Sequence, residues 1–512
     1  MNLKQDRRWY WGLTALVLVV AAAPYVALWL RAGRGFVFSG LVYNAADGYS
    51  YLAKMREGWM GTWRFTLPYT PRPGQGAYLY LFYLALGHLA RWVGLSLPLV
   101  YNLARLAGDA ALVWALGWFF GALFPRRAFA RRFAWAVALF TLGMGWMVLP
   151  WTGLTAPADL WFTDVYPFLI VLTNAHFPWA LAGVVALLRP GEPHWWDALL
   201  AFGVALLSPF GVVLAGLLLA VQFAVEYTFP TGEGARCGVF RFPGAETFCR
   251  GLWVAVGGVP YTAYVYWVTH ADPVLAQWTA QNRTPLPPWW NLLAALAPWG
   301  VVAVAGLWRR HPARRRLALW AGVALGLAVL PLAVQRRFLL GFEVPLVGLA
   351  ALWLEGRRRR GMWALALGGL VVPSLLMVWV LFPWRMGQRQ ASWWFLTREE
   401  AQAMVWLRDH TPADAVVLAA PQTGAVIPAW SGRRVVYGHD METIDGPRYR
   451  ELVGDFFRRC LKGRAAWAFL HDQGVDYIFL GPRERALGGL PIYLPPSAVA
   501  ARFGEVVIYR VP

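Results

Sequence analysis

Cysteine is scarce in this chain, with only Cys237, Cys249 and Cys460 among 512 residues. Their spacing matches no metal-binding motif and shows no paired pattern, so the sequence argues against a zinc module and predicts a fold without disulfide bonds. The chain also contains no phosphate-binding glycine loop, no nucleophile elbow and no sustained internal repeat. Nothing in the sequence therefore indicates phosphate-loop or nucleophile-elbow chemistry.

Charged residues are also few, at 14% of the chain, whereas apolar residues make up 58%. The apolar residues form repeated runs that can cross a bilayer, which takes about 20 residues per helix. A soluble core does not account for so many runs, so the sequence predicts a polytopic integral membrane protein. The first run, residues 11–30, is followed by no convincing small-residue cleavage site before Phe36 and is expected to be a retained span.

Acidic residues are outnumbered, with 27 of them against 47 basic residues. The basic residues stand in short clusters between apolar runs, which follows the positive-inside rule rather than a pattern for nucleic-acid binding. Some clusters are also expected to touch anionic lipid headgroups. Placing every cluster inside predicts about eleven spans, a cytoplasmic N-terminus in the plasma membrane and an extracytoplasmic region after residue 384. The four clusters are at residues 7–8, 126–132, 309–316 and 357–360.

Two stretches fit this alternation of inside and outside segments only with local adjustments. Residues 77–95 are predicted as an interfacial helix on the outer leaflet, because their tyrosines, His88 and Arg91 suit a headgroup environment and a span here would reverse the parity. Residues 197–227 are predicted as two short spans that meet near Ser208. The same count puts three other segments on the outer face: residues 153–166, 269–290 and 335–337.

The region from residue 385 to the end has a different character and is predicted to be an extracytoplasmic α/β domain with a partly parallel sheet. Thr397 followed by Glu400 is typical of a helix-starting capping box. Strands are predicted at 415–420, 434–437, 475–480 and 506–509, and helices at 448–461 and 465–473. Residues 1–384 form the predicted transmembrane domain, with an outer loop at 31–76.

Asp47 is the first candidate for chemistry, because it lies just beyond the first predicted span and therefore outside. It precedes an aromatic-rich stretch that also contains Arg72. A carboxylate at this position could be the general base of a glycosyl transfer to an acceptor hydroxyl. A solvated loop aspartate or a helix N-cap explains an isolated aspartate as well, so the assignment depends on the rest of the chain.

Several motifs follow one another along most of the chain: Asp47, residues 78–83, residues 100–105, Asp164, and residues 174–179, 335–339, 403–412, 438–443 and 474–484. Their order resembles that of the C-type (GT-C) membrane glycosyltransferases, chiefly of uncharacterised bacterial members. The resemblance implies an inverting transfer from a polyprenyl-phosphate sugar to a glycan, lipid or protein acceptor on the outer face, with Asp47 as base. Members often carry paired acids there, whereas Ala46 and Gly48 flank Asp47, so no cofactor is expected and a divalent metal is not favoured.

Six further residues are candidates for substrate binding. A guanidinium can make paired bonds to phosphate oxygens, which favours Arg336 or Arg337 as the ligand of a lipid phosphate. The alternatives for this pair are interfacial snorkelling or an ion pair with Glu343. Asp164 and His176 are expected to orient substrates, and their alternatives are a helix N-cap and a histidine bonded to a backbone carbonyl. The six are Asp164, His176, Arg336, Arg337, Glu343 and Arg72.

His439, Asp440 and Glu442 match no standard zinc spacing and are predicted to form a polar loop at the rim of the acceptor groove. Two other functions stay open at this point. The chain could be a non-enzymatic lipid or polysaccharide transporter, although transporters more often show two corresponding halves. It could also be an assembly partner of a cell-envelope machine, in which Asp47 has no chemical role.

Overall fold

Two compact units make up the chain. The computed structural model describes residues 3–152, 157–230, 236–237, 240–387 and 393–512. Unit 1 comprises Met1–Pro24, Ala104–Val265 and Arg283–Arg385, and unit 2 comprises Tyr25–Leu103, Tyr266–Asn282 and Met386–Pro512. Unit 2 therefore joins the segment that contains Asp47 to the C-terminal region, although most of unit 1 lies between them in the sequence.

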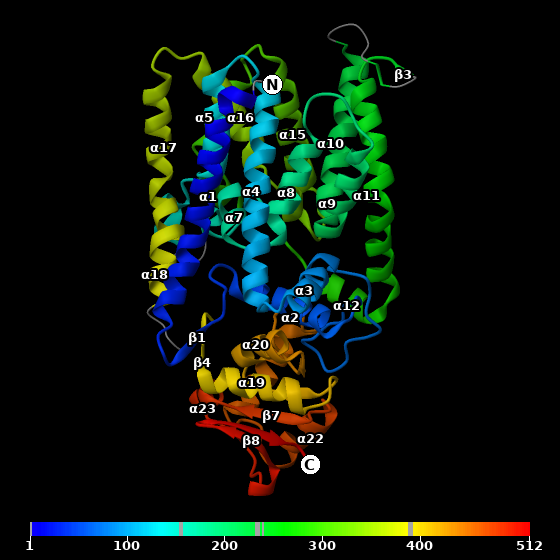
Figure 1. Ribbon diagram of the computed structural model, residues 1–512, viewed down its shortest axis with the longest axis vertical. Helices are drawn as coiled ribbons and strands as arrows, with labels where there is room; N and C mark the ends of the chain where they lie inside the picture. The colour runs from blue at the N-terminus through cyan, green and yellow to red at the C-terminus, as the bar shows by residue number, and fades with distance from the viewer. Residues whose placement is uncertain (1–2, 153–156, 231–235, 238–239, 388–392) are drawn as a thin grey trace. The chain divides into compact units, whose positions relative to one another are not determined.

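Unit 1 is almost entirely helical, and its helices α8, α9 and α10 lie side by side in Figure 1. The helices with residues in unit 1 are α1 (Leu3–Arg31), α4 (Leu97–Leu123), α5 (Ala128–Leu139), α6 (Leu149–Thr152), α7 (Pro167–Leu172), α8 (His176–Leu187), α9 (Trp196–Leu207), α10 (Pro209–Thr228), α11 (Ala245–Ala271), α13 (Trp289–Leu296), α14 (Trp299–Gly306), α15 (Pro312–Val329), α16 (Glu343–Glu355), α17 (Arg360–Leu376) and α18 (Phe382–Gly387). Shorter segments are η1 (Gly145–Val148), η2 (Ala158–Leu160), η3 (Gln335–Leu339), the π-helical η4 (Met377–Leu381), and the paired strands β2 (Arg236–Cys237) and β3 (Phe240–Arg241).

Five helical stretches of the described chain are long and apolar enough to cross a membrane, or six if α13 and α14, which meet at 75°, count as one span. The prediction of a multi-pass membrane protein is confirmed. The count of about eleven spans stays a prediction, because helices such as α8 and α9 have 12 residues each and reach only about 18 Å of a hydrocarbon core of about 30 Å. The five stretches are Arg7–Arg31, Leu97–Leu123, Pro209–Thr228, Gln335–Glu355 and Arg360–Arg385.

Helix α16 lies at the centre of unit 1, with nearly all of its residues buried. Glycines allow its neighbours to come close. A Cβ on Gly306 of α14 would lie 2.2 Å from the Leu349 carbonyl oxygen, and a Cβ on Gly348 would lie 2.9 Å from the side chain of Leu317 in α15. Small residues at such crossings are typical of helices that pack within membranes.

The four basic clusters lie at one end of unit 1, the end that carries the N-terminus in Figure 1. The guanidinium of Arg132 stacks on Trp9, with its carbon 5.3 Å from the ring centroid. Phe124 contacts His311 with ring centroids 5.7 Å apart, and Glu355 accepts a backbone hydrogen bond of 2.9 Å from the first turn of α5. The clusters that the positive-inside rule puts on one side therefore share one end of the unit.

The predicted break near Ser208 is confirmed. Helix α9 ends before Ser208, whose Oγ accepts a hydrogen bond of 3.3 Å from the Gly211 amide and caps α10. Pro209 takes the first helical position, where no amide hydrogen is required.

The expectation of a fold without disulfide bonds is wrong. Cys249, near the start of α11, is disulfide-bonded, whereas Cys460 is free and exposed. Spacing along the sequence does not give distances in the fold, which is why the cysteine pattern did not predict the bond.

Unit 2 combines helices with a five-stranded sheet. Its own helices are α2 (Ala45–Met60), α3 (Leu81–Val93), α12 (Pro273–Gln281), α19 (Arg398–His410), α20 (Pro421–Ser431), α21 (Gly446–Phe457), α22 (Arg464–Asp472) and α23 (Pro482–Leu487), with η5 at Pro496–Ala498. Its strands are β1 (Phe36–Phe38), β4 (Phe395–Thr397), β5 (Val416–Leu418), β6 (Arg434–Val435), β7 (Tyr477–Leu480), β8 (Val499–Phe503) and β9 (Val506–Arg510). Strand β1 pairs antiparallel with β4 and so ties the first loop to the C-terminal region.

The sheet has the strand order β6-β5-β7-β9-β8. Strand β5 is parallel to β6 and β7, whereas β9 is antiparallel to β7 and β8. Helix α19 contacts β8 and β9 and runs along the sheet in Figure 1, and Thr397 and Glu400 form the predicted capping box at its start. The strands and helices predicted for this region are present within a few residues, but the sequence analysis did not predict β8 or α20.

Helices α2 and α3 cross at two glycines, each of which faces the backbone of the other helix. A Cβ on Gly58 would lie 2.1 Å from the Leu84 carbonyl oxygen, and a Cβ on Gly87 would lie 2.0 Å from the Met55 carbonyl oxygen. Helix α3 has 13 residues and is therefore about 20 Å long, too short to cross a hydrocarbon core. Its assignment as an interfacial helix, which its exposed Trp92 suits, stays a prediction.

Candidate active site

Asp47 lies in the first turn of α2. Asn44, with φ at 50°, precedes the helix, and its amide donates a hydrogen bond of 2.7 Å to Asp47 Oδ2. A helix N-terminus favours negative charge, which stabilises the ionised carboxylate. The Asp47 side chain is 40% exposed. The N-cap alternative is therefore only partly right: Asp47 belongs to the N-terminal turn, but Asn44 takes the N-cap position.

His439 contacts the other oxygen of Asp47. Its Nε2 lies 3.1 Å from Asp47 Oδ1, and its side chain is 8% exposed. The Met441 amide donates a hydrogen bond of 3.2 Å to His439 Nδ1. In the neutral ring this bond leaves the proton on Nε2, which donates to Asp47. Asp47 is therefore oriented by donors on both carboxylate oxygens.

The same face of α2 carries a buried ion pair. Ser50 and Lys54 follow Asp47 by three and seven residues, so all three side chains lie on one side of the helix. Lys54 Nζ lies 2.6 Å from Glu442 Oε1 and 2.5 Å from Ser50 Oγ, and Ser50 also donates to Glu442. Lys54 is completely buried. Glu442 belongs to the same loop as His439, so this loop covers the Asp47 face of α2.

Aromatic rings surround the Lys54 ammonium. Its nitrogen is 4.3 Å from the ring centroid of Tyr80, 5.1 Å from that of Phe65 and 5.3 Å from that of Tyr51. These faces stabilise a cation that has lost most of its water. One turn further on, burial raises the pKa of Glu57 to about 8 although Thr66 donates hydrogen bonds to its carboxylate. Glu57 is therefore mostly protonated at neutral pH.

The loop of residues 438–443 is held from several sides within unit 2. Gln281 donates hydrogen bonds to the carbonyl oxygens of Met441 and Thr443 at 3.2 and 2.8 Å, and Asn282 donates to Met441 at 3.0 Å. A Cβ on Gly438 would lie 2.5 Å from both the Gly424 carbonyl oxygen and the Tyr69 ring. The loop can therefore pack this closely against α20 and Tyr69 only with glycine at this position.

Neighbouring charges shift the pKa values of two groups around Asp47 toward their charged forms. Burial lowers the pKa of His439, but its hydrogen bond to Asp47 and the carboxylates of Glu442 and Asp47 raise it above its ordinary value. Burial raises the pKa of Glu442, but Lys54 and His439 outweigh this and hold it below its ordinary value. A part-exposed carboxylate beside such a network can accept a proton from a hydroxyl group of a bound molecule.

A second cluster lies in unit 1 and contains three of the predicted residues. Arg336 Nε lies 3.3 Å from Asp164 Oδ2, and Arg337 donates a hydrogen bond of 3.2 Å to Asp164 Oδ1. Arg336 also stacks on Trp161, with its guanidinium carbon 5.3 Å from the ring centroid. Both arginines are part-exposed, and the cluster has an excess of positive charge. The N-cap alternative for Asp164 is wrong, because Tyr166 takes the cap position of α7.

Glu343 does not join the arginines. Its carboxylate is completely buried, and neither oxygen has a hydrogen-bond partner among the described residues. The alternative of an ion pair between the arginines and Glu343 is therefore wrong, because their carboxylate partner is Asp164. Asp159 is also buried and accepts hydrogen bonds from Ser374 Oγ at 2.6 Å and from the Gly145 amide at 3.0 Å.

The two remaining candidates, His176 and Arg72, contact other residues. His176 begins α8, and its ring stacks on Phe177 with centroids 4.3 Å apart. Arg72 is exposed and donates a long hydrogen bond of 3.4 Å to the Asp472 carbonyl oxygen. Their predicted contacts with substrate stay predictions. No group of three His, Cys, Asp or Glu side chains in the described ranges is placed to hold a metal ion.

The fold is that of the C-type (GT-C) membrane glycosyltransferases, which confirms the resemblance drawn from the sequence motifs. The oligosaccharyltransferase of Archaeoglobus fulgidus, solved with a tethered acceptor peptide, is similar over 92% of this chain and 69% of its own, with a TM-score of 0.51 and 14% identity. The mycobacterial arabinofuranosyltransferase AftD is similar over 98% of this chain and 41% of its own, with a TM-score of 0.53 and 15% identity. No protein-family model matches the chain, and no curated protein matches it in sequence.

Proposed function

We propose that this protein is a membrane glycosyltransferase that transfers a sugar from a polyprenyl-phosphate donor to a glycan, lipid or protein acceptor on the extracytoplasmic face. The observation that carries the proposal is the Asp47 carboxylate, part-exposed at the start of α2 and oriented by Asn44 and His439. The GT-C fold supports sugar transfer as the reaction class, since the similar structures are an oligosaccharyltransferase and an arabinofuranosyltransferase.

In the proposed reaction, the oxygen of an acceptor hydroxyl attacks the anomeric carbon of the donor sugar. The bond between this carbon and the phosphate oxygen breaks, and polyprenyl phosphate leaves with the bonding electrons. Asp47 takes the hydroxyl proton, and a single displacement inverts the anomeric configuration. His439 and Asn44 orient the carboxylate, and the proposal includes no divalent metal.

Arg336 and Arg337 are proposed as ligands of the donor phosphate. Charge on the leaving phosphate grows in the transition state, and guanidinium groups stabilise it with paired hydrogen bonds. Their shared ion pair with Asp164 supports this role, because it holds both side chains in place while leaving an excess of one positive charge. Asp164 is then a positioning residue, and Arg72 and His176 are proposed to contact substrate elsewhere.

Replacing Arg336 and Arg337 together with glutamine is expected to lower kcat/KM for the lipid donor by about 10²-fold or more, since each removes a donor to developing phosphate charge. Steady-state kinetics with varied donor concentration measure this. Arg358→Gln is the matched control, because Arg358 is exposed in the basic cluster after α16. Equal kcat/KM in the double variant and in the control would show that neither arginine binds the donor phosphate.

The orientation is part of the same proposal. The basic end of unit 1 is placed in the cytoplasm, and the C-terminal region, the predicted extracytoplasmic α/β domain, is placed outside. The donor and acceptor then meet on the outer face, and about eleven spans satisfy this arrangement.

The function is tested with purified full-length protein in lipid vesicles. Undecaprenyl phosphates that carry a radiolabelled hexose, pentose or amino sugar are supplied with a glycan and lipid extract as acceptor. We expect one donor to be consumed, with labelled product and free undecaprenyl phosphate formed in equal amounts. Adding a chelator is expected not to lower the transfer activity. Movement of intact donor across the bilayer without cleavage would instead identify a transporter, and neither cleavage nor movement would favour the assembly partner.

A further inference from the structure

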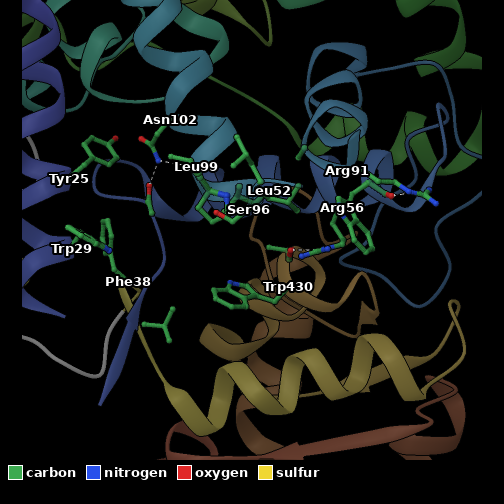
Figure 2. A pocket seen from close by; sticks show the side chains of 18 of the residues that line it. Tyr25, Trp29, Phe38, Leu52, Arg56, Arg91, Ser96, Leu99, Asn102 and Trp430 are labelled. Atoms are coloured by element: carbon green, nitrogen blue, oxygen red, sulfur yellow. Dashed lines mark hydrogen bonds between the residues drawn. The ribbon is translucent and has the colours of Figure 1, made fainter. Parts of the chain in front are cut away.

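A cavity of about 960 Å³ lies within unit 2, outside the site described above. Its volume is at the upper end of the roughly 300–1,000 Å³ that small-molecule sites occupy. Helix α2, the start of α4, the end of α1 and helix α20 contribute to its walls. Figure 2 shows Tyr25, Trp29 and Phe38 on one side of this cavity and Arg56 and Arg91 on the other.

The apolar side of the cavity is formed by the ends of two predicted spans. Tyr25 and Trp29 come from the last turns of the Arg7–Arg31 span, and Leu99 comes from the first turn of the Leu97–Leu123 span. Trp29 and Leu99 are substantially exposed, at 63% and 45%. Aromatic and aliphatic side chains at span ends lie at the level where lipid headgroups meet acyl chains.

The polar side of the cavity is basic. Three arginines line it and all contact Trp59: the guanidinium carbons of Arg56 and Arg408 lie 4.9 and 5.7 Å from the ring centroid, and Arg91 donates a hydrogen bond of 3.4 Å to the Trp59 carbonyl oxygen. Asp409 neutralises one charge through a two-bond pair with Arg408, at 2.7 and 2.9 Å. Burial and the neighbouring Arg408 lower the pKa of Arg56 to about 10, so an anion beside it would be favoured.

We infer that this cavity binds one anionic phospholipid of the surrounding membrane, with its phosphate among Arg56, Arg91 and Arg408 and an acyl chain along Trp29, Phe38 and Leu99. Charge complementarity identifies the headgroup, because three arginines line the cavity and Asp409 pairs with one of them. A guanidinium matches phosphate oxygens in planar, paired geometry. The apolar wall at the span ends identifies a lipid rather than a free phosphate.

The geometry of α2 separates this cavity from a donor that would react at Asp47. Arg56 follows Asp47 by nine residues, which is a rise of about 14 Å and a rotation of about 180° around the helix. A donor phosphate is bonded directly to the anomeric carbon at which the base acts, so it must lie close to Asp47. The cavity therefore takes a second lipid, and the inference does not depend on sugar transfer.

The test uses native mass spectrometry of the purified full chain in mixed micelles of phosphatidylglycerol and phosphatidylcholine. The wild type is expected to retain one phosphatidylglycerol in preference to phosphatidylcholine. A variant with Arg56, Arg91 and Arg408 all replaced by glutamine is expected to lose this preference by about tenfold or more, because three basic contacts are removed. A control variant replaces the exposed Arg464, Arg502 and Arg510 with glutamine and changes net charge equally.

Three results would overturn the inference: equal retention by the two triple variants, equal retention of the two lipids by the wild type, or displacement of phosphatidylglycerol by an equal amount of undecaprenyl phosphate. The last result would assign the cavity to the polyprenyl donor. Arg91→Gln alone guards against a folding defect, since Arg91 is exposed, and it is expected to weaken retention several-fold. Unchanged retention in this variant would also count against the site.

Discussion

Asp47→Asn is expected to lower the rate of sugar transfer by about 10²- to 10⁴-fold, the range that a general base contributes. The amide keeps the shape of the side chain and an oxygen that can accept the hydrogen bond from His439, but it cannot take a proton. The variant is therefore expected to fold and to bind the lipid donor with unchanged affinity. The measurements are kcat with saturating donor, donor affinity, and the thermal unfolding midpoint.

Asp414→Asn is the matched control for this prediction, because Asp414 is an exposed aspartate of the same unit. It is expected to have wild-type kcat. A folded Asp47→Asn protein with wild-type kcat would show that another group takes the proton. A variant that loses donor affinity along with kcat would show that Asp47 binds rather than acts as base.

Asp47 could be singled out from the sequence as a candidate, but its partners could not. Local patterns predicted the break at Ser208 and the capping box at Thr397, because each depends on residues close together in the chain. The positive-inside rule predicted the grouping of the basic clusters. His439 is 392 positions from Asp47, and it contacts Asp47 only because the loop after β6 lies over α2. Its spacing to Asp440 and Glu442 in the sequence gave no sign of contact with α2.

The arginine cluster gives a similar lesson. Nearness in sequence favoured Glu343 as the alternative partner of Arg336 and Arg337, but their carboxylate partner is Asp164, more than 170 positions away. Glu343 begins α16 at the centre of unit 1, so its side chain points into the packed helices. The predicted boundary between two domains at residue 384 likewise stays a prediction. In the structure, residues 386–512 belong to the same compact unit as the first loop.

A single replacement in the Lys54–Glu442 pair is expected to cost about 3–5 kcal/mol of stability, because the partner is left as an uncompensated buried charge. Lys54→Met and Glu442→Leu should each lower the thermal unfolding midpoint of the purified protein by several degrees. The double variant should recover most of the loss, since an apolar pair of similar volume replaces the ion pair.

The exposed pair Arg448–Asp445, at 3.6 Å with side chains 69% and 54% exposed, is the matched control. Arg448→Met is expected to cost less than about 1 kcal/mol of stability.

Unfolding by acid tests the Lys54–Glu442 pair independently. The folded-state pKa of Glu442 lies below its ordinary value, so its contribution is present above the ordinary pKa and is lost as the pH falls through the folded value. In the Glu442→Gln variant, this part of the decrease in stability at low pH should be absent. Additive single costs with no recovery in the double variant would show that Lys54 and Glu442 stabilise the fold separately rather than as a pair.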